Sequence, residues 1–382
     1  MVYADHAATT ALSNRALAAA LPFLQGKYGN ASSAYAFGKR ARQAIERARR
    51  QVADAVGAAA SEIVFTAGGS EGNNMVLRGA ADCAWRAGRR AHIVVSAIEH
   101  PSVLAPCRAL ERLGARIDYV PVSQEGRVAA ESVAAALSEE TCLVSVMLAN
   151  NEVGTVQDIA AIAELLKKRG VPFHTDAVQA IGHIPVDVKA LGVTYLTASG
   201  HKFGAMKGTG FLWQREGAEL PPLISGGGQE RGRRAGTENT AGIAALGEAL
   251  TESVERMQED AVHSRSLVAY TLRMIQREIP EVRVHGADGA HLPGILNIGI
   301  SGVRGESLVH LLDLKGICVS AASACSAGTD APSHVLCAMG YGEREAMEAL
   351  RISYGRENTQ EEAQRVVEEI VCAVKKLRAF SR

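Results

Sequence analysis

Short apolar runs alternate with longer segments whose apolar residues recur at helical spacing, from residue 40 to residue 200. The runs that are typical of buried strands are Ile63–Thr66, Ile93–Ser96, Leu143–Leu148, Pro172–Thr175 and Tyr195–Ala198. The segments with helical spacing are Arg40–Val56, Gly72–Ala87, Ser102–Leu113, Ala129–Leu137 and Ile159–Lys168. This alternation predicts an α/β fold, in which a mostly parallel sheet is covered by helices on both faces.

The pattern changes near residue 255, where a long helical segment begins. Glu255–Ile279 is followed by three strand candidates, Val282–His285, Ile295–Ile300 and Cys318–Ser320, and by helical segments at Gly305–Leu314, Ser333–Met339 and Thr359–Leu377. A chain of 382 residues also exceeds the usual size of one hydrophobic core. We therefore predict a large domain over 15–255, and a smaller α+β domain formed by 1–14 together with 256–382.

The charge balance argues against two classes of partner. Lys and Arg number 41, Asp and Glu also number 41, and hydrophobic residues make up 47% of the chain. A neutral chain gives no electrostatic reason to expect nucleic acid or an anionic membrane surface as a partner. The apolar runs are too short to cross a bilayer, and no secretory signal is visible at the first residues, so we expect a cytoplasmic protein.

The cysteines do not form a framework. Seven of them are scattered without a C-x-x-C pair, which fits neither a disulfide scaffold nor a zinc site. His174 and Asp176 could share a strand face as metal ligands, but no third ligand is evident and we predict no metal site. Cys325 stands apart because Ala321–Gly328 consists of small and polar residues, which suits an exposed, reactive thiol better than a core position.

A lysine and an aspartate suggest the chemistry. Lys202 follows a predicted strand among small and polar neighbours, where a partly desolvated amine can form a Schiff base. Asp176 ends another buried strand, and a buried carboxylate is costly unless it faces a cation or donors. A protonated pyridine nitrogen is such a cation, so the pair predicts pyridoxal 5′-phosphate as cofactor.

A phosphate site is also needed, and one turn provides it. Phe65–Gly72 runs from a strand into a helix through two glycines and a serine, which leaves free backbone N–H groups at a helix N-terminus. Gly69 and Ser70 lie in this turn. We group Ser199 and His201 with them as part of the same site.

The chain resembles a known family in ordered segments from one end to the other. It is similar to the cysteine desulfurases of the class-V aminotransferase group, which are fold type I pyridoxal-phosphate enzymes. The Ser-Ala-Cys context resembles the subgroup with a long mobile cysteine loop. The matching segments are 3–10, 28–33, 65–74, 98–101, 149–155, 174–179, 199–203, 226–237, 323–326 and 350–353.

The resemblance implies a role for each matching residue. Lys202 would carry the cofactor, Asp176 would pair with its ring nitrogen, and His100 would stack on its ring and move protons. The other cofactor contacts would be Gly69, Ser70, Ser199 and His201 at the phosphate, Asn151 and Gln179 at the phenolic oxygen, and Thr237 from the other subunit of a homodimer.

The implied reaction converts L-cysteine to L-alanine. Asn30 and Arg351 would bind the substrate carboxylate, with Arg351 as a bidentate clamp. The Cys325 thiolate would take the sulfur as a persulfide and pass it to an acceptor protein of iron–sulfur cluster assembly or tRNA thiolation.

Some positions depart from the family pattern, and alternatives stay open. Tyr35 stands where the family usually has His, Ala31 where proline is common, and Ala205-Met206 where Gly-Pro is usual, but no catalytic group is lost. A selenocysteine lyase or a cysteine sulfinate desulfinase would use the same lysine and depend less on a sulfur-accepting cysteine. A binding protein on a degenerate fold would carry no cofactor.

Overall fold

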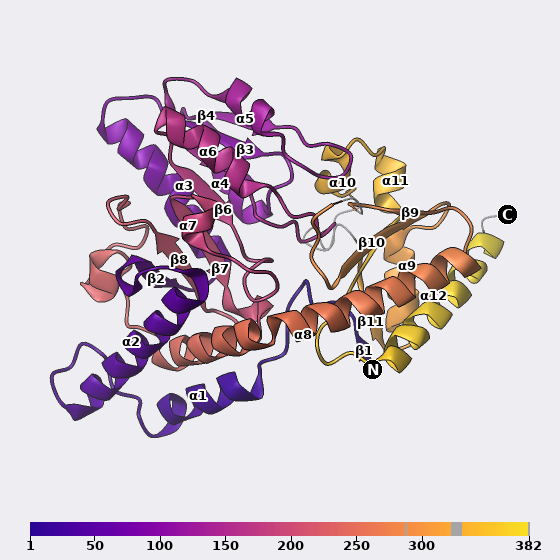
Figure 1. Cartoon of the computed structure of the whole chain (residues 1–382), viewed down its shortest axis with the longest axis horizontal. Coiled ribbons are helices and arrows are strands. Elements are labelled where there is room, and N and C mark those ends of the chain that lie inside the picture. Colours follow the sequence, from indigo (N-terminus) through magenta and orange to yellow (C-terminus); the bar gives the residue numbers. More distant parts are fainter. Residues whose placement is uncertain (287–288, 322–330, 381–382) are drawn as a thin grey trace.

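The large sheet confirms the predicted α/β fold. The computed structural model describes residues 1–286, 289–321 and 331–380. In Figure 1 the large sheet forms one layer of the molecule. Its seven strands lie in the order β2 (Ile63–Thr66), β8 (Gly210–Gln214), β7 (Tyr195–Ser199), β6 (Phe173–Asp176), β5 (Thr141–Ser145), β3 (His92–Ser96) and β4 (Arg116–Val120). Only β8 runs antiparallel to its neighbours β2 and β7, and the other pairs are parallel.

Helices cover both faces of this sheet because its strands are apolar on both sides. On β3, Ile93 and Val95 belong to one core cluster and Val94 to another. The first cluster takes residues of α3 (Gly69–Arg86) and α4 (Pro101–Glu111). The second face is covered by α1 (Asn14–Gln25), α2 (Ala36–Val56), α5 (Ala130–Ala136), α6 (Ile159–Arg169), α7 (Val188–Leu191) and the start of α8 (Thr240–Glu278). Continuous burial of both faces is the expected environment of a parallel sheet.

A second, smaller sheet gathers the two ends of the chain. Its order is β12 (Ser320–Ala321), β13 (Ala349–Ser353), β10 (Ile295–Ile300) and β9 (Val282–Val284), all antiparallel. β1 (Val2–Tyr3) pairs in parallel with β11 (Ile317–Cys318) beside it. α9 (Gly305–Asp313) and α12 (Gln360–Phe380) pack on this sheet, while α10 (His334–Ala338) and α11 (Glu343–Met347) face the large sheet through a cluster with Ile98 and Met147.

One helix connects the two sheets. α8 has 39 residues and runs from the large-sheet layer to the small sheet in Figure 1. Leu246 and Leu250 pack in the large-sheet core, whereas Leu267 and Ile275 pack in the small-sheet core. Residue 255, the predicted domain boundary, therefore falls inside a continuous helix, and the division into domains stays a prediction.

Several boundaries differ from the sequence expectation. The long helix begins at Thr240 and not at Glu255, because the Asn239 side chain accepts a hydrogen bond from Gly242 N (3.0 Å) and caps it there. β5 ends at Ser145, three residues before the predicted end at Leu148. The pattern did not predict β4, β8 or β13. No helix in the described part of the chain combines the length and the apolar character needed to cross a bilayer.

Candidate active site

A cavity of about 280 Å³ lies at the carboxyl ends of the large-sheet strands. β6 ends at Asp176 and β7 at Ser199, and the short 3-10 helix η2 (Gly200–Lys202) follows β7. Ligands of open α/β sheets bind at this edge. The cavity is lined by Ala7, Ala8, Gly69, Ser70, His100, Ser102, Met147, Ala149, Asn151, Asp176, Val178, Gln179, Ser199, His201, Lys202 and Arg351. Ten of these residues were predicted from the sequence, and the fold brings them together.

The amine of Lys202 is held at the cavity wall by the N-terminal segment. Lys202 Nζ donates to Ala7 O (2.6 Å) and Ala8 O (2.8 Å), and Gln179 Nε2 also donates to Ala7 O (3.0 Å). These carbonyls orient the amine before any cofactor binds. The N-terminal segment is thus a wall of the site, which the sequence motif at residues 3–10 indicated only by resemblance.

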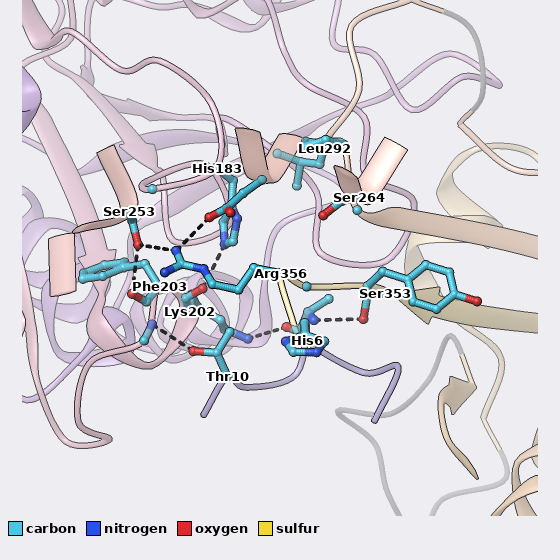
Figure 2. Close-up of a pocket in the computed structure, with 18 of the residues that line it drawn as sticks. His6, Thr10, His183, Lys202, Phe203, Ser253, Ser264, Leu292, Ser353 and Arg356 are labelled. Carbon is cyan, nitrogen blue, oxygen red and sulfur yellow. Dashed lines mark hydrogen bonds and ion pairs between the residues drawn. The ribbon is translucent and has the colours of Figure 1, made fainter. Parts of the chain in front are cut away.

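A second, smaller cavity of about 90 Å³, drawn in Figure 2, also has Lys202 in its lining. His183 Nε2 donates to Lys202 O (2.8 Å). Burial lowers the pKa of His183 and keeps its ring neutral. Ser253 Oγ on α8 donates to Phe203 O (3.1 Å), and Arg356 pairs with Asp260 (2.9 Å). The Ser253 bond fixes the backbone next to Lys202 against α8.

Asp176 is buried and keeps acceptor capacity toward the cavity. Its Oδ1 accepts from Val178 N (3.0 Å) and its Oδ2 from Asn73 Nδ2 (2.7 Å), and the side chain is 4% exposed. A carboxylate offers about four lone-pair directions, so these two bonds leave room for a further N–H donor. A protonated ring nitrogen is a donor of that kind.

His100 stands at the start of α4, where its ring caps the helix. Its Nδ1 accepts from Ser102 N (3.1 Å) and lies 2.7 Å from Ser102 Oγ. Burial lowers the pKa of His100, with Lys202 and His334 adding to the effect and Asp176 opposing it. The ring is therefore neutral at pH 7, and because Nδ1 is an acceptor, its proton lies on Nε2.

The N-terminus of α3 provides a cradle for an anion. Gly68 precedes the helix with φ of 146°, a conformation that favours glycine, and within the described part of the chain no side chain caps the helix there. A Cβ on Gly69 would lie 2.7 Å from Val178 Cγ2, so only glycine fits this close approach. Ser70, Ser199 and His201 line the cavity beside it. Burial lowers the pKa of His201 to about 4, so this ring is a neutral partner.

Arg351 reaches the cavity from β13 of the small sheet. Its Nη1 donates to Asn151 O (2.8 Å) and its Nη2 pairs with Asp5 Oδ1 (2.8 Å). Its Nε is buried and has no hydrogen-bond partner among the described residues. A guanidinium with an unpartnered buried N–H is a natural receptor for a carboxylate that enters the cavity.

A second buried acid, Glu99, supports the cavity wall from behind. Its Oε1 accepts from Ser96 Oγ (2.5 Å) and Met147 N (2.7 Å). Its Oε2 is buried without a partner in the described part of the chain. Burial raises the pKa of Glu99 to about 8, so the group is a neutral acid at pH 7 and adds no charge beside Asp176.

We expect the protonation of Glu99 to make the free energy of unfolding depend on pH, and we expect Glu99→Gln to remove this contribution. The folded state binds the proton of Glu99 more tightly than the unfolded state, whose pKa is near 4.5. Its contribution to the free energy of unfolding is fully present below pH 4.5 and is lost as pH rises through 8. Relative to Glu99→Gln, the wild type should lose up to about 1.4 kcal/mol per pH unit in this window. Urea unfolding of both proteins from pH 5 to pH 8 measures the difference, and parallel curves would contradict it.

Two predicted site residues, Asn30 and Thr237, do not line this cavity, and a third lies outside the described residues. Asn30 is exposed, and its Oδ1 accepts from Ser32 N (2.9 Å). Thr237 is exposed and lines a separate pocket of about 200 Å³ with Thr66 and Arg234. Cys325 lies outside the described residues. In the described chain, no group of three His, Cys, Asp or Glu side chains could hold a metal ion.

Sequence reasoning missed four residues that shape the site. Asn73 and Ser102 contact Asp176 and His100, and Asp5 pairs with Arg351. Glu99 lies inside a motif that carried the resemblance, but received no role. The signal that could have found Glu99 is its place directly after Ala97 and Ile98, since a polar group buried with apolar neighbours needs partners. Asn73 gives no such signal.

The fold and the cavity together define the class of protein. A buried carboxylate at one strand end, a lysine after the next strand and an uncapped helix N-terminus with glycines fit the ring nitrogen, aldehyde and phosphate of pyridoxal phosphate. The model of the aminotransferase class-V family matches residues 2–366, and the chain belongs to this family, whose members depend on pyridoxal phosphate.

Similar proteins cover the whole chain. It is 42% identical to a cysteine desulfurase IscS of Dictyoglomus turgidum, over 100% of this chain and 96% of the relative. A solved structure of a NifS-like protein superposes with a TM-score of 0.92, at 36% identity over 98% of this chain and 99% of the other. The structure of SspA in complex with cysteine has a TM-score of 0.83, at 34% identity over 94% of this chain and 100% of SspA.

Proposed function

We propose that this protein is a pyridoxal-phosphate-dependent cysteine desulfurase, which converts L-cysteine to L-alanine and supplies sulfur for iron–sulfur cluster assembly. The observation that carries the proposal is one cavity that contains Lys202, Asp176 and Arg351. These supply an amine for the cofactor, a carboxylate for its ring nitrogen and a guanidinium for an α-carboxylate. Relatives named cysteine desulfurase, and SspA with bound cysteine, support the choice of substrate over selenocysteine or cysteine sulfinate.

Each residue of the cavity has its own role in the proposed reaction. Pyridoxal phosphate, when bound, supplies a sink for the electron pair left on the substrate Cα after its proton is lost. Lys202 Nζ leaves the carbonyls of Ala7 and Ala8 and removes that proton. Asp176 keeps the ring nitrogen protonated, and Arg351 orients the substrate through its carboxylate. His100 presents its Nε2 proton to the cavity.

Sulfur transfer is assigned to Cys325. The Cys325 thiolate forms an S–S bond with the substrate sulfur while the Cβ–S bond breaks. Cβ keeps the electron pair and gains a proton, so alanine leaves and a persulfide stays on the protein. An acceptor protein, of iron–sulfur cluster assembly or of tRNA thiolation, then removes this sulfur.

A single-turnover experiment tests this function. Incubation of the holoenzyme with L-cysteine, without reductant, should give one alanine per site and one added sulfur atom on the Cys325 peptide. With a reductant present, Cys325→Ser should form alanine at least about 10²-fold more slowly. Cys372→Ser, an exposed cysteine on α12, serves as the matched control. Alanine formed by Cys325→Ser at the wild-type rate would contradict the role of this thiol.

We propose that the protein is a homodimer and that exposed apolar side chains mark the contact. Leu17, Leu21 and Leu24 are 46%, 44% and 56% exposed on one face of α1, whose opposite side is buried through Ala16 and Ala20. Tyr28, Tyr35 and Phe37 are also exposed, on the segment that contains Asn30. Single exposed apolar residues are common, but a contiguous set is typical of an interface. In Figure 1 this segment and the 215–235 segment lie at the end of the molecule opposite the small sheet.

The dimer also offers a reason why Asn30 and Thr237 are distant from the cavity of their own chain. If each reaches the partner's cavity, the site is complete only in the assembly. Sedimentation equilibrium at micromolar concentration should give twice the chain mass, and Leu21→Arg should give one chain mass. A wild type that sediments as a monomer would contradict the proposal.

Two further proposals concern the division of the chain into domains and the compartment of the protein. We propose the domain division at 15–255 against 1–14 with 256–382, supported by the separate apolar cores of the two sheets. We propose the cytoplasm as the compartment, because seven scattered cysteines without a disulfide framework suit a reducing environment.

A further inference from the structure

A chain of hydrogen bonds joins the two ring-facing residues behind the cavity. Asn73 Nδ2 on α3 donates to Asp176 Oδ2 (2.7 Å) and to Ser102 Oγ (2.9 Å). Ser102 Oγ lies 2.7 Å from His100 Nδ1, and Ser102 N donates to the same nitrogen (3.1 Å). Four residues from three elements are therefore connected without a gap.

The direction of each proton in this chain is determined. An amide nitrogen carries two N–H donors and no acceptor, so Asn73 uses one proton for each partner. Ser102 Oγ accepts from Asn73, and its own hydroxyl proton is free to point at His100 Nδ1. That nitrogen already accepts the backbone N–H of Ser102. It is therefore an acceptor for two donors, and the imidazole proton must lie on Nε2.

The amide of Asn73 is held in this orientation at a cost. Its side chain is fully buried, and its Oδ1 has no hydrogen-bond partner among the described residues. A flipped amide would place Oδ1 against the Asp176 carboxylate, which repels it. An unsatisfied buried acceptor is destabilising, and the two hydrogen bonds that the amide nitrogen donates offset this cost.

We propose that Asn73 is a positioning residue for both sides of the cofactor ring: one amide proton holds Asp176 Oδ2, and the other holds the Ser102 hydroxyl so that its proton points at His100 Nδ1. The backbone N–H of Ser102 keeps the imidazole proton on Nε2, and the hydroxyl adds a second donor that orients the ring. Loss of Asn73 frees the Ser102 hydroxyl to turn away from His100 Nδ1, and the ring then keeps only the backbone donor. This inference rests on the proposed function in one respect, namely that the group between Asp176 and His100 is the cofactor ring.

The hydrogen bonding of His100 Nδ1 is the direct test, and it needs no turnover. In ¹⁵N spectra of cofactor-free protein labelled at histidine, His100 should show a pyridine-type Nδ1 and a pyrrole-type Nε2, assigned by the signal lost in His100→Gln. In Asn73→Ala the Nδ1 signal should move downfield, away from the Nε2 signal, because Nδ1 loses the hydroxyl donor while the proton stays on Nε2. Ser102→Ala should cause a change of the same kind, and the double variant should add little to either single one.

The controls separate positioning from folding. Asn74→Ala alters the next residue of the same helix, whose Nδ2 bonds Ser70 O (2.9 Å), and should leave the His100 shifts unchanged. If Asn73→Ala does not fold, Ser102→Ala carries the test alone. Wild-type shifts in a folded Asn73→Ala, or in Ser102→Ala, would overturn the proposal. In the holoenzyme, kcat should fall about tenfold in Asn73→Ala while KM for cysteine stays constant. A wild type that forms no alanine would refute the proposed function and leave the result on His100 Nδ1 intact.

Discussion

Lys202→Ala is expected to abolish cysteine desulfuration, with a fall of about 10⁴-fold or more in kcat. In the proposed function the lysine has two tasks, because its amine would attach the cofactor and then remove the substrate proton. No other lysine lines the cavity among the described residues. The variant should also lose the visible absorbance of bound cofactor. Alanine release from L-cysteine and the absorbance spectrum measure the two effects.

The fold should survive this change. The carbonyls of Ala7 and Ala8 lose a donor, but the Gln179 bond to Ala7 O keeps the N-terminal segment in place. Lys207→Ala, an exposed lysine five residues further on, is the matched control and should behave as the wild type. A Lys202→Ala protein that retains a tenth of the activity would show that another group performs the chemistry.

Asp176→Asn is expected to lower kcat by about 10²- to 10⁴-fold, with cofactor still attached at Lys202. The amide has the shape of the carboxylate but no charge to keep the ring nitrogen protonated. It also mismatches its neighbours, because Val178 N and Asn73 Nδ2 both donate to Asp176, and an amide nitrogen cannot accept from either. Steady-state kinetics, together with the visible spectrum, separate lost chemistry from lost cofactor.

Asp176→Glu gives the complementary result. It retains the charge but moves it by one methylene, so its activity should exceed that of Asp176→Asn if charge dominates. Equal activity of Asp176→Asn and the wild type would mean that the carboxylate does not act on the ring nitrogen.

The architecture could be predicted where the hydrophobic period was unambiguous. β2, β3, β6 and β7 lie within one residue of their predicted bounds, and β2 and β3 each contain three consecutive apolar residues, Ile63–Phe65 and Ile93–Val95. β8 was missed although Phe211–Trp213 is an apolar run of the same kind, and no local signal specifies its antiparallel place between β2 and β7. The first half of α8 was missed because its alanines and glycines give a weak period, although Asn239 is a recognisable cap.

The site could be predicted where chemistry and sequence position coincide. Asp176 ends β6 and Lys202 follows β7, and the parallel arrangement of these two strands brings their carboxyl ends to one edge of the sheet. The role of Asn73 could not be predicted, because nothing in the sequence distinguishes it from Asn74, and only the packing of α3 against β6 and α4 places its nitrogen between two partners. Asn30 and Thr237 were predicted from the resemblance alone, and both are exposed and do not line the cavity.

Borohydride reduction of the purified holoenzyme, followed by peptide mapping, tests the central claim most directly, because reduction fixes the cofactor to the amine that holds it. The account predicts a phosphopyridoxyl group on the peptide that contains Lys202. A label on a different lysine, or a protein that takes up no pyridoxal phosphate, would contradict it.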